Sequence, residues 1–395
     1  MRSDMDDFLS ADDAEGIRKI RQNFANGTDI PAELNTDFNL ARWWRGHHRN
    51  MDTIVSRLRL YIENRQLMGF DKPDFLESFS QREKTKTVAQ YFSMSHLCSA
   101  PVNRDNGVVL VEGGAFDHRV VNVFTTSDYL ETFHGFCECV MQLVLRRERE
   151  TGKPSHGICI FDMGGVELAK HLNPTASANR VFKARARIWH EFYPEMMSGI
   201  YIVNPPYFLG VVWSIVKFLL PSETQKRLHF CHKYDQLLQH LDASVVPAAF
   251  GGTFLNGQYT ARADCMNERT PVREEDFFVP QIWTRFCVEP VPQMKHCSIG
   301  AGRMLRLPHE VADANGARVL WQFSGNGDVE FGVSKLEEGN SSGRLVYPRL
   351  RLVPTEVQEE GSVELRTVGT YILEFYNPSS VFAIKFQYSV VQIPL

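Results

Sequence analysis

The feature of this chain that most restricts its fold is a long segment without charged side chains, from Met196 to Val216. Its length is close to the roughly 20 apolar residues that a membrane-spanning helix needs. In the middle of the segment Asn204 is followed by Pro205 and Pro206. Proline removes a backbone donor and forces the preceding residue out of helical geometry. The segment therefore predicts two elements instead of one membrane-spanning helix.

The parts on either side of the two prolines predict a strand and a helix. Residues 200–203 are β-branched or aromatic, which is typical of a strand buried on both faces. Residues 207–220 predict a helix that ends before Pro221 and carries a single charge, Lys217. A helix that is apolar on nearly all sides must be covered on all sides. Two interpretations remain open: a helix of the protein core, or a lid over an apolar ligand.

Composition bounds the class of protein. The 395 residues are 43% hydrophobic and 23% charged, as in ordinary globular proteins, and the length suggests two or three domains. A formal net charge of −4 gives no reason to expect nucleic-acid binding. The acidic segment 1–16 lacks the apolar core of a signal peptide, which predicts a cytoplasmic protein. The eight cysteines show no Cys-x-x-Cys spacing, so we expect reduced thiols and no metal site.

Residues 1–88 predict a small lobe of helices. Potential capping residues such as Ser10 and Thr36 precede segments with apolar side chains at helical spacing. The first of these segments places three apolar side chains on one face: Ile17, Ile20 and Phe24. A basic cluster follows that could bind phosphate groups or simply face solvent: Arg42, Arg45, His47, His48 and Arg49.

The rest of the chain predicts an α/β domain, a linker and a β-sandwich. Residues 89–254 alternate between strand-like and helix-like segments, which favours a mixed, largely parallel sheet covered by helices. The strand-like segments are 108–114, 120–126 and 157–165, and the helix-like ones are 127–150 and 176–193. The polar segment 255–276 predicts a linker. Residues 277–395 predict an antiparallel sandwich with an aromatic core: Trp321, Phe323, Phe331, Tyr371, Phe375 and Phe386.

The apolar segment and its surroundings resemble the CRAL-TRIO lipid-binding domain family. The resemblance rests on YPE at 193–195, IYIVNPP at 200–206, KFLLPSETQKR at 217–227 and VPAAFGG at 246–252. It implies that residues 207–220 form the gate helix of a lipid cavity. The gate and pocket residues that it implies are apolar or aromatic: Tyr201, Val203, Phe208, Val211, Val212, Ile215, Val216, Phe218 and Leu219.

The C-terminal region resembles the GOLD (Golgi dynamics) domain, on residues 319–333 and 369–390. The order of the two domains is similar to that in the supernatant protein factor and tocopherol-associated protein group. The resemblance implies a multidomain chain with a helical N-terminal lobe, an α/β CRAL-TRIO domain, and an all-β GOLD sandwich at 277–395.

The resemblance also implies a site for a lipid headgroup. Glu195 and Arg227 match the carboxylate and the lysine with which phosphatidylinositol-binding members hold the inositol ring and its phosphate. Arginine replaces lysine here, and its planar group bonds phosphate in a bidentate manner. Lys226, Thr224 and Arg45 are further headgroup candidates. Alternatively, Glu195 and Arg227 form a structural ion pair and the pocket selects a neutral lipid such as tocopherol, squalene or a retinoid.

Enzyme motifs are incomplete in this sequence. His190-Glu191 begins the zinc motif H-E-x-x-H, but Pro194 occupies the position of the second histidine. We therefore expect no enzyme and no cofactor other than a bound lipid. The expected partners are a phospholipid or another hydrophobic small molecule, a membrane surface that is bound transiently, and a protein bound by the GOLD domain. Two functions remain open: a cytoplasmic carrier that exchanges lipid at membranes, and a lipid-sensing adaptor in vesicle or Golgi traffic.

Overall fold

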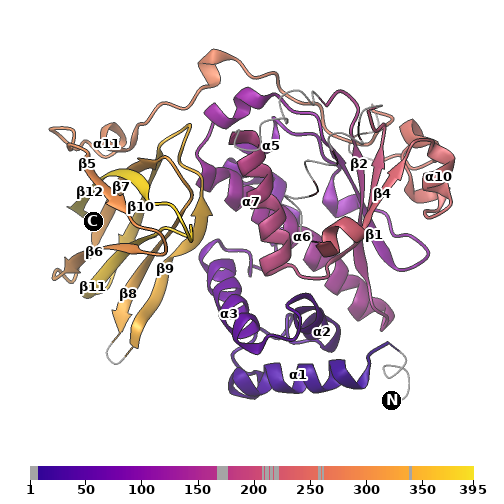
Figure 1. Ribbon diagram of the computed structural model, residues 1–395, viewed down its shortest axis with the longest axis horizontal. Helices are drawn as coiled ribbons and strands as arrows, with labels where there is room; N and C mark the ends of the chain where they lie inside the picture. The colour runs from indigo at the N-terminus through magenta and orange to yellow at the C-terminus, as the bar shows by residue number, and fades with distance from the viewer. Residues whose placement is uncertain are drawn as a thin grey trace. The chain divides into compact units, whose positions relative to one another are not determined.

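The computed structural model divides the chain into two compact units (Figure 1). The described residues are 8–166, 177–206, 209, 213, 217, 222–256, 259, 262–337 and 340–395. The N-terminal unit comprises Met1–Ile62, Asp71–Asp117 and Thr132–Pro271. The C-terminal unit comprises Glu63–Phe70, His118–Glu131 and Val272–Leu395. Each unit therefore combines segments that are distant in the sequence.

Helices form the first part of the N-terminal unit, as the sequence predicts. They are α1 (Ala11–Asn23), α2 (Asp37–Gly46) and the larger part of α3 (Met51–Leu67). At the start of α1 the Ser10 hydroxyl accepts a hydrogen bond from Asp13 N (3.1 Å), and the Asp13 carboxylate accepts one from Ser10 N (2.9 Å). This reciprocal pair satisfies amides that a helix start leaves without partners. The predicted apolar face of α1 is buried: Ile17, Ile20 and Phe24.

Four strands form the sheet of the N-terminal unit. They are β1 (Gly107–Gly113), β2 (His156–Asp162), β3 (Met197–Val203) and β4 (Leu228–Cys231), in the order β1-β2-β3-β4. The sequence predicted a mixed, largely parallel sheet, and every neighbouring pair of these described strands is parallel. Parallel neighbours need crossover connections. Two of the crossovers contain the helices α6 (Thr126–Thr151) and α7 (Ser177–Phe192).

The N-terminal unit also contains short α-helices among its described residues: α4 (Phe75–Ser78), α5 (Glu83–Ala89), α9 (Ser222–Lys226) and α10 (Tyr234–Leu238). Figure 1 shows α6 and α7 on one side of the sheet and α10 on the other. None of the helices in the described ranges combines the length and the apolarity needed to span a bilayer.

The face of the sheet toward α10 is a closely packed core. Successive side chains of a strand point to opposite faces, so alternate residues of β1 to β4 share this side. Its buried members include Val109, Val111, Ile158, Ile160, Val203 and Cys231 from the strands, and Leu237, Val245 and Phe250 from the following segment. The residues on the opposite face of the same strands form the site described below.

The prediction of a strand at 120–126 is wrong. His118–Asn122 forms a 3-10 turn, and α6 begins at Thr126. Val120, Val123 and Phe124 are buried all the same. A short run of buried apolar residues does not by itself distinguish a strand from a tightly packed turn.

The described strands of the C-terminal unit form two antiparallel sheets, as predicted. One has the order β10-β7-β12-β5 and the other β6-β11-β8-β9. The strands are β5 (Lys295–Ile299), β6 (Met304–Val311), β7 (Ala317–Gly325), β8 (Val329–Glu337), β9 (Asn340–Leu352), β10 (Glu359–Leu365), β11 (Gly369–Tyr376) and β12 (Ile384–Pro394). A short helix, α11 (Ile282–Arg285), precedes them.

Aromatic side chains join the two sheets of the C-terminal unit. Phe323 in β7 lies 5.1 Å from Phe375 in β11, with the rings edge to face. Such pairs add to the energy gained by burying the rings. All six aromatic residues predicted for this core are buried: Trp321, Phe323, Phe331, Tyr371, Phe375 and Phe386.

Candidate functional site

A cavity of about 510 Å³ lies within the N-terminal unit. This size falls in the range of about 300–1,000 Å³ that is usual for small-molecule sites. The cavity is bounded by one face of the sheet and by residues of α6 and α7. Its lining is mainly apolar and aromatic, with a few charged side chains at defined places.

The floor of the cavity consists of two rows of side chains that run across the four strands. The first row is Leu110, Cys159, Ile200 and Leu228. The second row is Glu112, Phe161, Ile202 and Phe230. The strand registers bring one residue of each strand into each row, and the two-residue period of the strands puts both rows on one face. One side of the sheet is therefore hollow and the other is packed.

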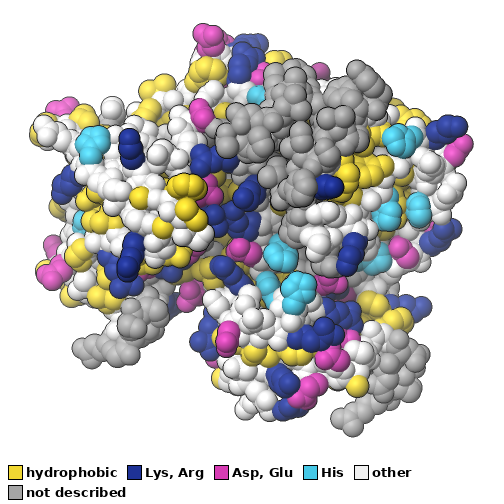
Figure 2. Space-filling view, viewed as in Figure 1, with side chains coloured by type: hydrophobic (Ala, Val, Ile, Leu, Met, Phe, Trp, Pro, Cys, Tyr) yellow, Lys and Arg dark blue, Asp and Glu magenta, His cyan; other side chains and the backbone are white. Residues whose placement is uncertain are grey.

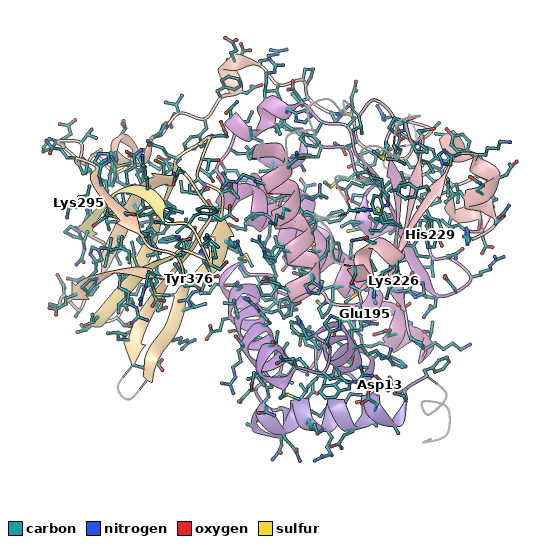
Figure 3. The ribbon with its side chains drawn as sticks, in the orientation of Figure 1. Asp13, Glu195, Lys226, His229, Lys295 and Tyr376 are labelled. Carbon is teal, nitrogen blue, oxygen red and sulfur yellow. The ribbon has the colours of Figure 1, made fainter. Side chains whose placement is uncertain are left out.

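The structure corrects the expected pocket assignment of Tyr201 and Val203. Both point to the opposite face of β3, where Val203 is fully buried in the core. Tyr201 stacks on His229, with ring centroids 4.9 Å apart. Figure 3 shows His229 on the side of the sheet away from α7. Ile200 and Ile202 line the cavity in their place. A strand that is apolar on both faces does not reveal which face meets a ligand.

Helices α6 and α7 provide the wall opposite the sheet. Their lining side chains include Phe133 and Phe136 from α6, and Ala186, Trp189 and His190 from α7. Asn179 and Arg185 lie on the same side of α7. A cavity between a sheet and two helices is shaped by rigid elements, so its form does not depend on loops alone.

Two residues of the predicted gate segment also line the cavity. They are Leu209 and Trp213, and the Trp213 and Phe230 rings lie edge to face with their centroids 5.2 Å apart. The other residues expected in the gate lie outside the described residues: Phe208, Val211, Val212, Ile215, Val216, Phe218 and Leu219. The gate helix therefore stays a prediction.

The structure brings Glu195 and Arg227 together at one end of the cavity. Glu195 precedes β3 and Arg227 precedes β4, so both lie at the amino end of the parallel strands. The two side chains form an ion pair, and Arg227 Nη1 also donates to the carbonyl oxygen of Met197 (2.9 Å). Both line the cavity and remain about a quarter exposed, at 24% for Arg227 and 30% for Glu195. An anionic group in the cavity would meet a fixed guanidinium at this end.

A close backbone contact holds Glu195 in place. Glu195 has a positive φ of 57°, which side-chain-bearing residues rarely adopt. Gly46, the last residue of α2, lies against the preceding residue, and a Cβ atom there would be 2.4 Å from Pro194 Cβ. Glycine is required at this point because any side chain would displace the loop that carries Glu195.

Arg45 lines the same end of the cavity as Glu195. Its guanidinium is bonded to Asp13, with Nε 2.7 Å from Oδ1. Arg45 lowers the pKa of Asp13 to about 2 through this hydrogen bond, and Asp13 in turn raises the pKa of Arg45. The Arg45 side chain keeps 42% of its surface exposed. It contributes a second positive charge to this end of the cavity.

Lys226 and Thr224 are not placed in the cavity lining as Arg227 is. Lys226 is exposed and does not belong to the cavity lining, although Figure 3 shows it near Glu195 at the end of the sheet. The side chain of Thr224 lies outside the described residues. Of the four predicted headgroup residues whose side chains are described, three line the cavity: Glu195, Arg227 and Arg45.

The basic cluster of α2 is divided between several structural roles. Arg42 is buried in an ion pair with Glu148 and also donates to Ser155 O (2.9 Å). His47 is buried, and burial lowers its pKa to about 4. Arg49 pairs with Asp12 at 2.8 Å. Apart from Arg45, only His48 of this cluster lines the cavity.

A second charged pair in the cavity was not predicted. Glu112 ends its row on β1, and Arg185 reaches it from α7 to form an ion pair. The Arg185 guanidinium also lies over the Phe133 ring, 4.3 Å from its centroid. The sequence signal was a single glutamate inside the apolar strand GVVLVEG. Within the described ranges, no set of three or more His, Cys, Asp or Glu side chains is arranged to hold a metal ion.

Comparison with known proteins identifies a domain within the N-terminal unit. Residues 105–252 match the family model of the CRAL/TRIO domain. A CRAL-TRIO domain-containing protein of Caenorhabditis elegans is 29% identical over 371 residues, which cover 92% of this chain and 91% of the relative. A phosphatidylinositol/phosphatidylcholine transfer protein of Arabidopsis thaliana is 24% identical over 259 residues, which cover 62% of this chain and 44% of the relative.

Among solved structures, the crystal structure of Sfh5 has a TM-score of 0.42 at 14% identity, and the match covers 62% of this chain and 88% of Sfh5. The evidence for the family comes from the family model and the sequence relatives. They show that residues 105–252 of this chain form a CRAL-TRIO domain.

Proposed function

We propose that this protein binds a lipid in the cavity of its N-terminal unit and exchanges it at membranes. The observation that carries the proposal is an apolar cavity with a charged pair at one end, built largely from the residues of the CRAL-TRIO domain. The relative named as a phosphatidylinositol/phosphatidylcholine transfer protein supports this class of ligand.

Burial of the acyl chain would supply most of the binding energy. Each buried methylene contributes about 0.8 kcal/mol, so a chain of ordinary length gains on the order of 10 kcal/mol. Release into water would then be very slow, and exchange needs a second apolar phase. The predicted gate helix at 207–220 would open at a membrane, where its apolar side chains move into the bilayer interface. Leu209 and Trp213, which line the cavity, are the described part of that segment.

The charged end of the cavity suits a phosphate-bearing headgroup. Arg227 and Arg45 provide two cations there, and Glu195 provides an acceptor for hydroxyl groups such as those of inositol. Charge-assisted bonds of this kind are stronger than neutral ones. A phosphatidylinositol-like lipid is therefore the ligand we propose. A neutral lipid would leave the pair between Glu195 and Arg227 as a structural contact.

The antiparallel sandwich of the C-terminal unit fits the GOLD domain that its sequence resembles. We assign it that identity as part of this proposal, with the CRAL-TRIO domain at 89–254 and a linker at 255–276. The chain would act in the cytoplasm and associate with membranes reversibly.

Ligand binding can be tested with a variant whose new side chain fills the cavity. Ala186 lines the cavity on α7, and Lys183 on the same helix is exposed. Ala186→Trp should reduce the lipid that copurifies with the protein at least tenfold, because the indole occupies ligand volume, whereas Lys183→Trp should leave it unchanged. Native mass spectrometry of the full chain, followed by analysis of the extracted lipid, measures both. Equal lipid content in the two folded variants would refute the cavity as the binding site.

Transfer of labelled lipid between two vesicle populations separates the carrier from the adaptor. A carrier moves lipid in proportion to protein, and Ala186→Trp abolishes this movement. Tight lipid binding without transfer would instead identify a lipid-sensing adaptor.

A further inference from the structure

The loop that joins β11 to β12, residues 377–383, exposes two adjacent apolar side chains. Val381 is 70% exposed and Phe382 is 75% exposed, the largest fractions among the large hydrophobic side chains that the structure describes. The loop passes from one sheet of the sandwich to the other, since β11 and β12 belong to different sheets. We name residues 377–383 the tip loop. Neighbouring exposed apolar side chains at a loop tip indicate a contact with something outside the chain.

Asn377 fixes the conformation of the tip loop. Its side chain is fully buried, and Nδ2 donates to the carbonyl oxygens of Ile299 (2.9 Å), Gly300 (3.1 Å) and Phe382 (2.8 Å). Its Oδ1 accepts a hydrogen bond from Ser379 N (3.0 Å). A buried side chain with this many partners holds both ends of the loop together. The exposed side chains are therefore presented in a fixed place, and binding loses little conformational entropy.

Ser379 provides hydrogen-bond partners for backbone amides of the tip loop. Its hydroxyl accepts hydrogen bonds from Val381 N (3.2 Å) and Phe382 N (2.9 Å). Its carbonyl oxygen accepts one from Gly302 N (2.9 Å), which ties the tip loop to the turn between β5 and β6. Backbone amides that already have partners do not oppose transfer into an apolar medium. The amides of the two apolar residues therefore already have partners before the tip leaves water.

Two cations flank the apolar tip. Arg303 lies in the adjacent turn and Lys385 lies at the start of β12, and both are exposed. No ion pair of either side chain occurs among the described residues. The sequence has no acidic residue at 299–305 or at 375–395. Figure 2 shows hydrophobic, basic and some acidic side chains on the face of the C-terminal unit that is turned to the viewer. The two exposed cations beside the tip are complementary to an anionic surface.

We propose that the tip loop docks the C-terminal unit onto anionic membranes. Val381 and Phe382 enter the boundary between headgroups and acyl chains, while Arg303 and Lys385 contact lipid phosphates. A membrane fits this site better than a folded protein, because a stable protein partner covers about 800 Å² per side and needs a broad complementary surface. A loop with two exposed apolar side chains suits a bilayer, which yields around it. This docking does not depend on the contents of the cavity.

The experiment uses sedimentation of the full chain with vesicles of phosphatidylcholine alone or with added phosphatidylserine. The wild-type protein should bind the anionic vesicles and bind the neutral ones weakly. Val381→Ser with Phe382→Ser should lower the binding constant for anionic vesicles about tenfold or more, since it removes most of the inserted apolar area. Arg303→Gln with Lys385→Gln should lower binding to anionic vesicles only. Raising the salt concentration should have the same effect on the wild type.

Val368→Ser is the matched control. Val368 is 56% exposed and lies at the opposite end of β11 from the tip loop, so its loss should leave binding unchanged. Failure of the wild type to bind anionic vesicles, or wild-type binding by the Val381→Ser/Phe382→Ser variant, would overturn the proposal. Ala186→Trp should bind vesicles normally although it holds no lipid. Loss of cavity binding and loss of docking are thereby distinguished.

Discussion

Arg227 makes two different bonds at the polar end of the cavity. One joins it to the carboxylate of Glu195 and the other to the carbonyl oxygen of Met197, so the guanidinium is oriented from two sides. An oriented guanidinium binds phosphate with more geometric selectivity than a lysine on a flexible stem. The neighbouring Lys226 carries the same charge but does not line the cavity.

Because Arg227 lines the cavity and Lys226 does not, replacing each of them should affect lipid binding differently. Arg227→Met should lower the amount of copurified phosphate-bearing lipid by about tenfold to a hundredfold, because hydrogen bonds to charged groups contribute about 1.5–3 kcal/mol. Lys226→Met, one residue away, should change it little. Phosphorus analysis of the extracted lipid measures the effect. If Arg227→Met keeps its full content of phospholipid, the arginine is structural and the ligand is selected by the apolar walls.

Glu195 and Arg227 lie together for a physical reason. Glu195 and Arg227 each precede a strand of the parallel sheet. The amino ends of parallel strands lie at the same edge, so the two side chains meet there. Tyr201 and Val203 were assigned to the pocket because a strand that is apolar on both faces does not show its orientation. The pair of Glu112 and Arg185 is formed across 73 residues, and no local pattern announces such a contact.

At the level of elements, the close approach of α2 to the loop before β3 supports the polar site. Gly46 ends α2 directly against Pro194, and the next residue is Glu195 with its positive φ. The helix end and the loop are therefore positioned as one piece. The position of the carboxylate depends on a glycine that is distant in sequence.

Gly46→Ala should disturb this arrangement. The new methyl group would lie 2.4 Å from Pro194 Cβ, so the loop must shift, and overpacking of this kind costs about 1–3 kcal/mol of unfolding free energy. We expect a lower melting temperature together with reduced lipid content. Gly152→Ala is a suitable comparison, because no atom lies within 4 Å of the position where its Cβ would be, although its φ of 66° adds backbone strain. A Gly46→Ala protein with normal lipid content and stability would contradict the proposed support.

The sequence predicted most helices and strands correctly, but not all of them. The helices α1, α6 and α7 and the strands of the sandwich follow from their periodicity and their capping residues. The segment 120–126 was misassigned, since its apolar side chains are buried by a turn and not by a sheet. Whether the sheet is purely parallel depends on which strands become neighbours, which local sequence does not encode.

At the scale of the whole molecule, one buried carboxyl group makes stability depend on pH. Glu359 in β10 is fully buried and accepts hydrogen bonds from Thr126 N (2.7 Å) and Ser127 N (3.2 Å) at the start of α6. All three residues belong to the C-terminal unit. Burial raises the pKa of Glu359 from 4.5 to about 7, although the bonds to the amides act in the opposite direction.

The sign of the pH effect follows from this shift. Between pH 4.5 and about 7 the carboxyl group ionises in the unfolded chain but stays protonated in the folded one, so the contribution of Glu359 to the unfolding free energy decreases as pH rises. Glu359→Gln keeps an oxygen acceptor and removes the ionisation. Relative to the wild type, it should gain about 2–3 kcal/mol between pH 5 and pH 8, at about 1.4 kcal/mol per pKa unit. Urea unfolding at both pH values measures this gain. If the unfolding free energies of Glu359→Gln and the wild type differ by the same amount at pH 5 and at pH 8, the raised pKa of Glu359 is contradicted.

The division of the sheet into a hollow face and a packed face separates two kinds of substitution. Leu110, Cys159 and Ile200 face the cavity, whereas Val109, Ile158 and Val203 are buried in the core on the opposite face. Because the two sets alternate along each strand, a change at a cavity-facing position would reshape the hollow and leave the contacts of the packed face in place.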